Sequence, residues 1–368
     1  MIHNPDAFTA SLLAVEGIKN ATTVLNGPTG CKFYHAHISD RQYPRASSFD
    51  PLTYNEEFYF GQPRVPCTYM EEEDYVNGST EKLQRILPVI ASKNDNLIAI
   101  VNSPGASLIG DDLERTLEEA GLADRCVAIG NSGYSSSFYR GFEKTIIKIL
   151  EWIQLEKHEI STNKVNLIGL SIYHNYWDSS VEELKKILSL MDLEVEAVIC
   201  AGTTMEEIRS SASVAYNIVL CQEYGLNIAK WYENKFGIPY VLSPAGAPVG
   251  YDATATWIRL IANRTGANPA EALELLNYMR KKNYHKIARF HSLTGLPKGA
   301  SFALKADVSI ALPLTKWLYV YLGMMPAGIE VLPNGNSKLE ADLIDFLEDV
   351  DFREAWNNFP GQDDVDIV

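Results

Sequence analysis

The stretch VNLIGLSIYHNYWDSSVEELKKILSLMDLEVEAVICA (165–201) contains the structural unit on which this chain is built. Its two ends, 165–172 and 195–201, are short runs of mostly apolar residues, and the part between them, 179–191, has apolar residues at helical spacing. Strands that are apolar nearly throughout are typical of a parallel sheet that is covered on both faces. The stretch therefore predicts a right-handed β–α–β unit.

The same alternation extends along most of the chain. Further strands are predicted at 22–27, 97–102, 126–130, 217–221, 238–243 and 307–312. Helices are predicted at 79–93, 111–121, 138–157, 204–211, 224–236, 250–263 and 268–290. A polar segment (156–164) and a Gly/Pro-bearing segment (291–302) divide this pattern. We therefore expect an α/β protein with three Rossmann-like parallel domains, 1–160, 161–293 and 294–368, of which the third is short or truncated.

Charge and composition exclude several classes of function. The 368 residues include 47 acidic and 32 basic ones, a net charge of −15, which repels nucleic acid and anionic lipid, so neither is an expected partner. No apolar run of about 18 residues predicts a membrane span, and no secretory signal is recognisable, so we expect a cytoplasmic protein. The sequence has no P-loop, nucleophile elbow, zinc-protease motif or dinucleotide fingerprint, so this chain is not expected to hydrolyse ATP itself.

The cysteines favour metal binding or free thiols over disulfides. Their number is odd and no signal peptide is recognisable. No Cys-x-x-Cys pair is present, so a metal site would have to gather thiols from distant positions or from two chains. The five are Cys31, Cys67, Cys126, Cys200 and Cys221.

The segment NGPTGC (26–31) follows a predicted strand and opens a predicted helix. Gly27 and Gly30 let the backbone turn tightly. Cys31 lies near the helix N-terminus, where the helix dipole and free N–H groups lower the pKa of a thiol, and a thiolate there is a good ligand for a soft metal. The alternative is a small buried cysteine in a strand–helix turn, and the residues alone leave both interpretations open.

Two more cysteines have the same two interpretations. Cys67 lies in a long, aromatic-rich loop (44–70), ahead of a helix that Ser79 is expected to cap. Cys221 ends a predicted strand and enters a helix, so its pKa is expected to be lowered as at Cys31. Each is either a metal ligand or an incidental buried thiol.

The histidines are few. His174 follows the strand 165–172, at the sheet edge where ligands of α/β proteins bind, and is either a catalytic proton donor or a satisfied surface histidine. His35 and His37 lie two residues apart on a predicted helix, so they point to different faces and do not form a chelating pair.

Five segments, taken in chain order, resemble the component 1 family of nitrogenase-type oxidoreductases, which includes nitrogenase α and β subunits and the subunits of dark-operative protochlorophyllide reductase. They are NGPTGC (26–31), MEEEDYVNGSTEKL (70–83), NSPGASLIGDDL (102–113), NIVLCQEYGLNIAKWYENKFGIPYVLSPAGAPVGYDAT (217–254) and LTKWLYVYLGMMPAGIEV (314–331). No single segment is decisive, but five in the same order are highly specific.

The resemblance implies a set of cofactor ligands. Cys31, in the turn with Gly27 and Gly30, would hold an iron–sulfur cluster that bridges two subunits, and Cys67 would be its second ligand. Two chains would then supply four thiolates, enough for one [4Fe–4S] cluster. Cys221 matches the cysteine that holds the active-site cofactor in α-type subunits, which implies a possible second metallocluster.

This chain also departs from the family pattern. The first cluster cysteine has no counterpart, Ser103 replaces the third, and Phe142 stands where nitrogenase has a pocket histidine. The C-terminal cofactor histidine also has no match. Dinitrogen is therefore not the expected substrate.

The expected function is that of a nitrogenase-like reductase subunit in a homodimer, or in a heterodimer with a related subunit. An ATP-dependent iron–sulfur reductase, similar to the nitrogenase iron protein, would supply low-potential electrons. An unidentified substrate would bind near His174, Cys221 and the loop 244–251. Two alternatives remain: a scaffold for metallocluster assembly without turnover, and a metal-free relative that only pairs with a partner.

Overall fold

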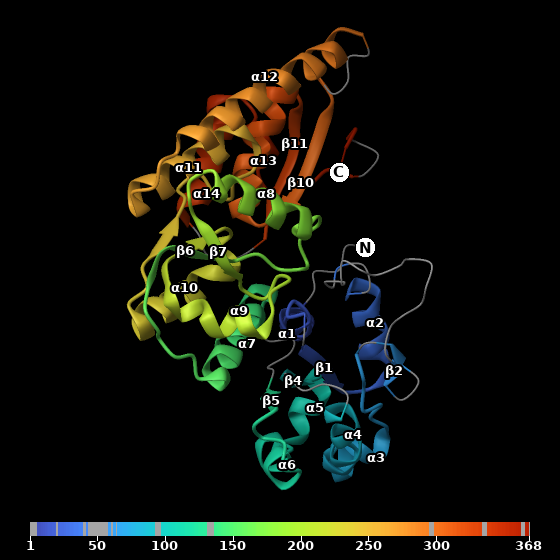
Figure 1. Cartoon of the computed structure of the whole chain (residues 1–368). Helices are drawn as coiled ribbons and strands as arrows, with labels where there is room; N and C mark the ends of the chain where they lie inside the picture. Colours follow the sequence, from blue (N-terminus) through green and yellow to red (C-terminus); the bar gives the residue numbers. More distant parts are fainter. Residues whose placement is uncertain are drawn as a thin grey trace.

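Parallel sheets flanked by helices form the framework of the chain (Figure 1). The computed structural model describes residues 6–19, 21–39, 42, 58–59, 62–63, 65–92, 97–130, 136–293, 298–332, 337–361 and 365–367. One parallel sheet lies in each of the three expected parts of the chain, and the α/β class is confirmed. Most of the predicted loop 44–70 lies outside the described residues.

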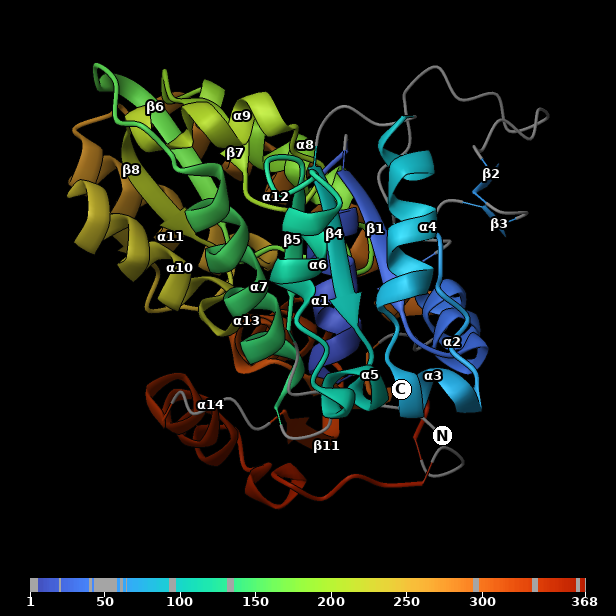
Figure 2. The ribbon, with the colours of Figure 1, turned by 90° about the horizontal axis from the view of Figure 1, so that it is seen from below.

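The N-terminal sheet has the strand order β1-β4-β5, and all its strands are parallel. Its strands are β1 (Ala21–Asn26), β4 (Leu97–Asn102) and β5 (Cys126–Ile129). Helices α4 (Thr80–Ala91) and α6 (Leu113–Glu119) cover one face. Helices α1 (Ala7–Glu16) and α7 (Phe138–Ile153) cover the other (Figure 2). Successive residues of a strand point to opposite faces of the sheet, so they pack alternately into the hydrophobic cores on its two faces.

Helix α1 was not predicted. All its residues except Thr9 are buried, and Asp6 caps it by accepting a hydrogen bond of 2.9 Å from the Thr9 backbone N–H. A helix that is apolar on all sides has no amphipathic period to detect. It packs so closely on α7 that a Cβ at Gly141 would lie 2.5 Å from the Ala7 carbonyl oxygen.

The middle sheet has the order β7-β6-β8-β9 and is also parallel. Its strands are β6 (Ser161–Ile168), β7 (Glu194–Val198), β8 (Val214–Val219) and β9 (Tyr240–Leu242). The helices of this part are α8 (Trp177–Ser189), α9 (Met205–Ser210), α10 (Gln222–Phe236), α11 (Gly250–Thr265) and α12 (Ala270–Leu293). The chain adds β7 on one side of β6 and β8 on the other. The carboxyl ends of β6 and β8 therefore form the switch point at which doubly wound sheets bind ligands.

The C-terminal part corrects one strand prediction. Residues 307–312 are not a strand: Asp307 is the N-cap of α13 (Val308–Leu322), and the strand β10 (Ser301–Ala306) precedes it. The run DVSIAL contains β-branched residues, but its aspartate starts a helix, and packing overrides the weak strand propensity. β10 pairs in parallel with β11 (Met325–Val331), and α14 (Ser337–Asp349) follows.

The first two expected domains share one hydrophobic core. One cluster of contacting buried side chains includes residues from Phe8 in α1 to Ala272 in α12. A separate cluster lies around β10 and β11. The proposed boundary near residue 160 therefore stays a prediction. None of the helices within the described ranges is long and apolar enough to span a membrane.

Candidate functional site

Cys31 and Cys67 lie at the carboxyl end of β1. Two residues separate β1 from α2 (Thr29–Ser39), so Cys31 is the third residue of that helix. The segment around Cys67 runs parallel to β1: the Leu25 N–H donates to the Pro66 carbonyl oxygen at 2.9 Å, and the Thr68 N–H to that of Leu25 at 3.1 Å. The structure thus brings the two thiols to one sheet edge.

A buried polar network fixes this edge. Asn26 Nδ2 donates to Ser79 Oγ at 2.9 Å and to Asn102 Oδ1 at 2.8 Å. Thr68 Oγ1 donates to Asn26 Oδ1 at 2.8 Å, and Ser79 Oγ donates to Asp111 Oδ2 at 2.7 Å. Ser79 is the N-cap residue of α4 as expected, but its side chain bonds to this network and accepts no hydrogen bond from the helix. The signal in the sequence that could have indicated this network is a polar residue at the end of each apolar strand, Asn26 and Asn102.

The two glycines of the turn act differently from the prediction. Neither has a positive φ, so neither is required by a left-handed turn. A Cβ at Gly27 would lie 2.7 Å from the Cβ and Oγ of Ser103, so Gly27 permits close packing. A Cβ at Gly30 would have no atom of the described residues within 4 Å, so this part of the chain leaves open space beside Cys31. Ser103 itself caps α5 (Pro104–Ile109) by accepting a hydrogen bond of 3.2 Å from the Ala106 N–H.

The expectation of a lowered thiol pKa is wrong for Cys31 and Cys221, and the pKa of Cys67 is raised as well. Burial raises the pKa of Cys67 to about 11, although the Tyr69 N–H donates to its Sγ at 3.4 Å. Burial, with the charge of Asp6, also raises the pKa of Cys31. The pKa of Cys221 is raised well above its ordinary value, chiefly by burial. Apolar surroundings outweigh the helix N-terminus here, so without a metal these groups are neutral thiols at pH 7.

Cys31 and Cys67 fit half of an iron–sulfur site. Thiolates are the ligands that iron–sulfur clusters use, and a metal displaces the thiol proton when it binds. Across the described residues, no group of three or more His, Cys, Asp or Glu side chains could hold a metal ion. Within the described residues this sheet edge thus offers two of the four thiolates that a [4Fe–4S] cluster uses.

A second set of predicted residues surrounds one pocket at the switch point of the middle sheet. It has a volume of about 470 Å³. His174 from the loop after β6, Cys221 from the turn after β8, and Ala247–Val249 line it together. A Cβ at Gly169 would lie 2.3 Å from the Cys221 carbonyl oxygen, so the ends of β6 and β8 approach here at backbone distance. We refer to this cavity as the central pocket.

His174 is not a satisfied surface histidine. Its Nδ1 lies 3.0 Å from the Ser171 backbone nitrogen and 3.1 Å from the Ser171 carbonyl oxygen, and its Nε2 is buried without a hydrogen-bond partner in the described part of the chain. Burial lowers its pKa to about 4, so the imidazole is neutral at pH 7. If Nδ1 accepts from the Ser171 N–H, the proton is on Nε2, which then donates at the pocket; if Nδ1 donates to the Ser171 carbonyl oxygen, Nε2 is an acceptor there.

The pKa of His174 predicts a pH-dependent stability. Its unfolded pKa of 6.5 exceeds the folded value of about 4, so the unfolded chain binds the proton first and stability falls as pH drops below 6.5. From pH 7.5 to pH 5 this group should cost about 2 kcal/mol. Urea unfolding of wild type and of His174→Gln at both pH values measures it. Equal losses in the two proteins would contradict the buried neutral imidazole.

Tyr224 and Asp307, which the sequence did not indicate, connect this pocket to the C-terminal part. The Tyr224 ring packs edge-on against His174 with centroids 4.9 Å apart, and its hydroxyl donates to Asp307 Oδ2 at 2.6 Å. Nearby, the Ser309 N–H donates to Glu223 Oε1 at 2.9 Å. Burial raises the pKa of both carboxyls. The start of α13 is thereby fixed beside Cys221.

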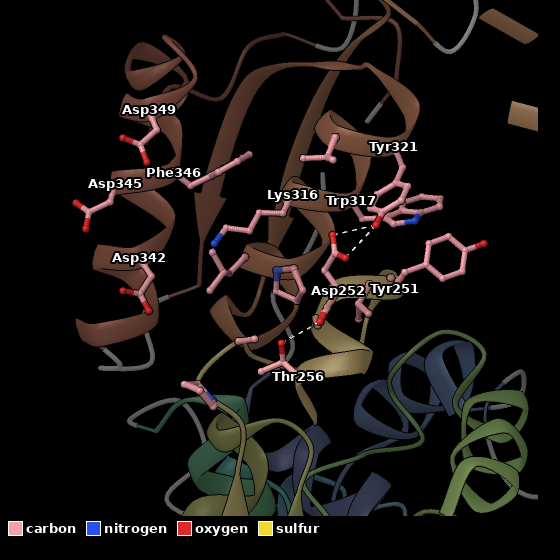
Figure 3. A pocket seen from close by; sticks show the side chains of 18 residues that line it. Tyr251, Asp252, Thr256, Lys316, Trp317, Tyr321, Asp342, Asp345, Phe346 and Asp349 are labelled. Atoms are coloured by element: carbon pink, nitrogen blue, oxygen red, sulfur yellow. Dashed lines mark hydrogen bonds between the residues drawn. The ribbon is translucent and has the colours of Figure 1, made fainter. Parts of the chain in front are cut away.

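A larger pocket of about 620 Å³ lies between α11, α13 and α14 (Figure 3). Tyr321 donates to Asp252 at 3.0 Å, and Lys316 Nζ lies 5.4 Å from the centre of the Phe346 ring. Its lining residues include neither cysteine nor histidine. Of these two pockets, the central pocket is the one lined by a thiol and an imidazole.

The fold is that of nitrogenase component 1. A solved structure of nitrogenase Cp1 at pH 6.5 superposes with a TM-score of 0.72 at 17% sequence identity, over 98% of this chain and 78% of that one. A second, at pH 5, gives a TM-score of 0.68 at 17% identity, over 94% and 70% of the two chains.

Sequence comparison agrees. Residues 6–358 match the family described as nitrogenase component 1 type oxidoreductase, and this chain belongs to that family. It is 23% identical over 293 residues to the B subunit of light-independent protochlorophyllide reductase from Nostoc punctiforme, a match that covers 76% of this chain and 53% of the relative. The same protein from Leptolyngbya boryana is 25% identical over 279 residues, 71% of this chain and 51% of the relative. The chain thus spans about half the length of these curated relatives.

Proposed function

We propose that this chain is a nitrogenase-like reductase subunit with two separate sites. Cys31 and Cys67 hold an iron–sulfur cluster, most simply [4Fe–4S], shared with a second subunit. An ATP-dependent iron–sulfur reductase delivers low-potential electrons to it. A substrate other than dinitrogen is reduced in the central pocket. The observation that carries this proposal is the pairing of two thiols at one outer sheet edge, in a family of oxidoreductases.

The surface around Cys31 supports a shared cluster. Large apolar side chains are exposed on the helices at this edge: Phe33 by 72% and Tyr34 by 74% on α2, Val76 by 83% on α3 (Glu72–Asn77) and Leu108 by 88% on α5. Clustered exposed apolar side chains mark protein interfaces. A second subunit that covers this face would bring its own thiols beside Cys31 and exclude water from the cluster.

The residues of each site have distinct tasks. When bound, the cluster stores and passes single electrons. Cys31 and Cys67 hold it, and the Asn26 network keeps Cys67 beside β1. In the central pocket, His174 Nε2 offers a hydrogen bond to a polar atom of the substrate, and Tyr224 holds the imidazole in place. Cys221 lines the same cavity and is available there as a ligand of a second metallocluster.

The central pocket favours a reductase over a scaffold for cluster assembly. A scaffold needs the cysteines but not a cavity lined by an imidazole nitrogen that has no hydrogen-bond partner among the described residues. The departures at Ser103 and Phe142 remain the basis for proposing a substrate other than dinitrogen.

The test is an anaerobic purification, with any copurifying subunit, followed by iron and sulfide analysis and EPR spectroscopy of the dithionite-reduced protein. We expect about four irons per pair of chains and the signal of a reduced cluster. Absence of iron after careful reconstitution would contradict the redox function. Iron without electron transfer to any substrate would favour the scaffold.

A further inference from the structure

The helix that carries Cys31 is attached to the core by polar side chains. Among its described residues α2 buries only His35 and Ser39. Both contact the carboxylate of Glu16, the last residue of α1. His35 Nε2 lies 2.5 Å from Oε2, and Ser39 Oγ lies 2.8 Å from each carboxylate oxygen. All three residues are buried, at most 8% exposed.

This trio lies close to the candidate ligand. Cys31, His35 and Ser39 are spaced four residues apart and therefore share one side of the helix. Glu16 belongs to a helix that is buried at every position but one. The Cys31 thiol is thus one helical turn away from a contact with a fixed part of the core.

A polar attachment determines direction as well as distance. Apolar packing is non-directional and tolerates small rotations of a helix, whereas hydrogen bonds constrain both length and angle. Contacts at two positions one turn apart restrict rotation about the helix axis and displacement along it. Buried charged pairs add little net stability compared with apolar residues, and their best-attested benefit is a defined arrangement. The large apolar residues Phe33 and Tyr34 of α2 are exposed, so they do not anchor this helix to the core by apolar packing.

We propose that Glu16, His35 and Ser39 are positioning residues that set the direction of the Cys31 thiol. The purpose of this positioning, cluster binding, rests on the proposed function. The positioning itself is measurable in the metal-free chain.

The experiment compares His35→Ala, the conservative His35→Gln and a control, His37→Ala, which changes an exposed residue of the same helix. The rate at which iodoacetamide alkylates Cys31 in the metal-free chain is measured by mass spectrometry, with buried Cys126 and Cys200 as internal reporters of unfolding. We expect His35→Ala to raise the Cys31 rate roughly five- to tenfold, because its helix moves more freely. His35→Gln should restore most of the protection, and His37→Ala should leave the rate unchanged.

Two outcomes of the alkylation experiment overturn the proposal. One is a Cys31 rate in His35→Ala equal to that of wild type. The other is an equal rise at Cys31, Cys126 and Cys200, which would show that the trio only stabilises the fold. In reconstituted protein, His35→Ala should also change the shape of the reduced EPR signal, and an identical signal would count against the proposal. If wild type binds no iron but the alkylation pattern holds, the proposed function fails and the positioning stands.

Discussion

Cys67→Ala is expected to abolish the iron–sulfur cluster that we propose two subunits share. Iron should fall from about four per pair of chains to less than about one, and electron flow to a substrate by on the order of a hundredfold or more. The reason is that each chain contributes only two thiols to this edge, so one substitution per chain removes half of the ligands of a symmetric site. Cys31→Ala should have the same effect. Iron analysis, EPR spectroscopy and a reductase assay measure it.

The matched control is Cys126→Ala. Cys126 is also a buried cysteine of the N-terminal part, 2% exposed, but it begins β5 and so lies at the opposite edge of the sheet. Both substitutions remove one buried sulfur and should destabilise the fold by a similar small amount, about 1 kcal/mol. Equal iron in the Cys67 and Cys126 variants would refute the assignment of Cys67 as a ligand.

The sheets could be predicted from the sequence because their strands are apolar runs of the right length. The strand at 97–102 has the predicted bounds, and most of the others shift by a few residues at their ends. The prediction of a strand at 307–312 failed because its apolar residues Val308, Ala311 and Leu312 pack into the C-terminal core from a helix, which the local β-branched composition does not indicate. Helix α1 was not predicted because a helix buried on nearly all sides has no polar face, and so its sequence lacks the amphipathic period that indicates a helix.

The candidate sites were predicted less completely than the fold. The carboxyl ends of parallel strands meet at one edge, and this placed His174 and Cys221 together around one pocket. The contacts of Tyr224 with Asp307 and of His35 with Glu16 join residues distant in sequence. The prediction of lowered thiol pKa values was wrong for a related reason. Burial depends on the packing of the whole chain, and its effect on the pKa outweighs that of the local helix dipole.

Gly169→Ala is expected to cause the largest loss of stability, about 3 kcal/mol or more. Gly169 has a φ of +90°, and an added Cβ would lie 2.3 Å from the Cys221 carbonyl oxygen and 3.1 Å from its nitrogen. Backbone atoms of a buried sheet edge cannot move aside as a flexible side chain can. The ends of β6 and β8 would have to separate, which widens the central pocket and moves Cys221 relative to His174.

The substitution of a second glycine, Gly121, distinguishes the energetic cost of the steric clash from that of the backbone strain. Gly121 also has a positive φ, +66°, but no atom of the described residues lies within 4 Å of the position of an added Cβ. Gly121→Ala should therefore cost only the strain of a left-handed alanine, about 1 kcal/mol. Urea unfolding of both variants gives the difference, and the alkylation rate of Cys221 reports on the pocket. Equal losses of stability, with Cys221 still protected, would mean that the two strand ends separate easily and that their close approach does not hold the site together.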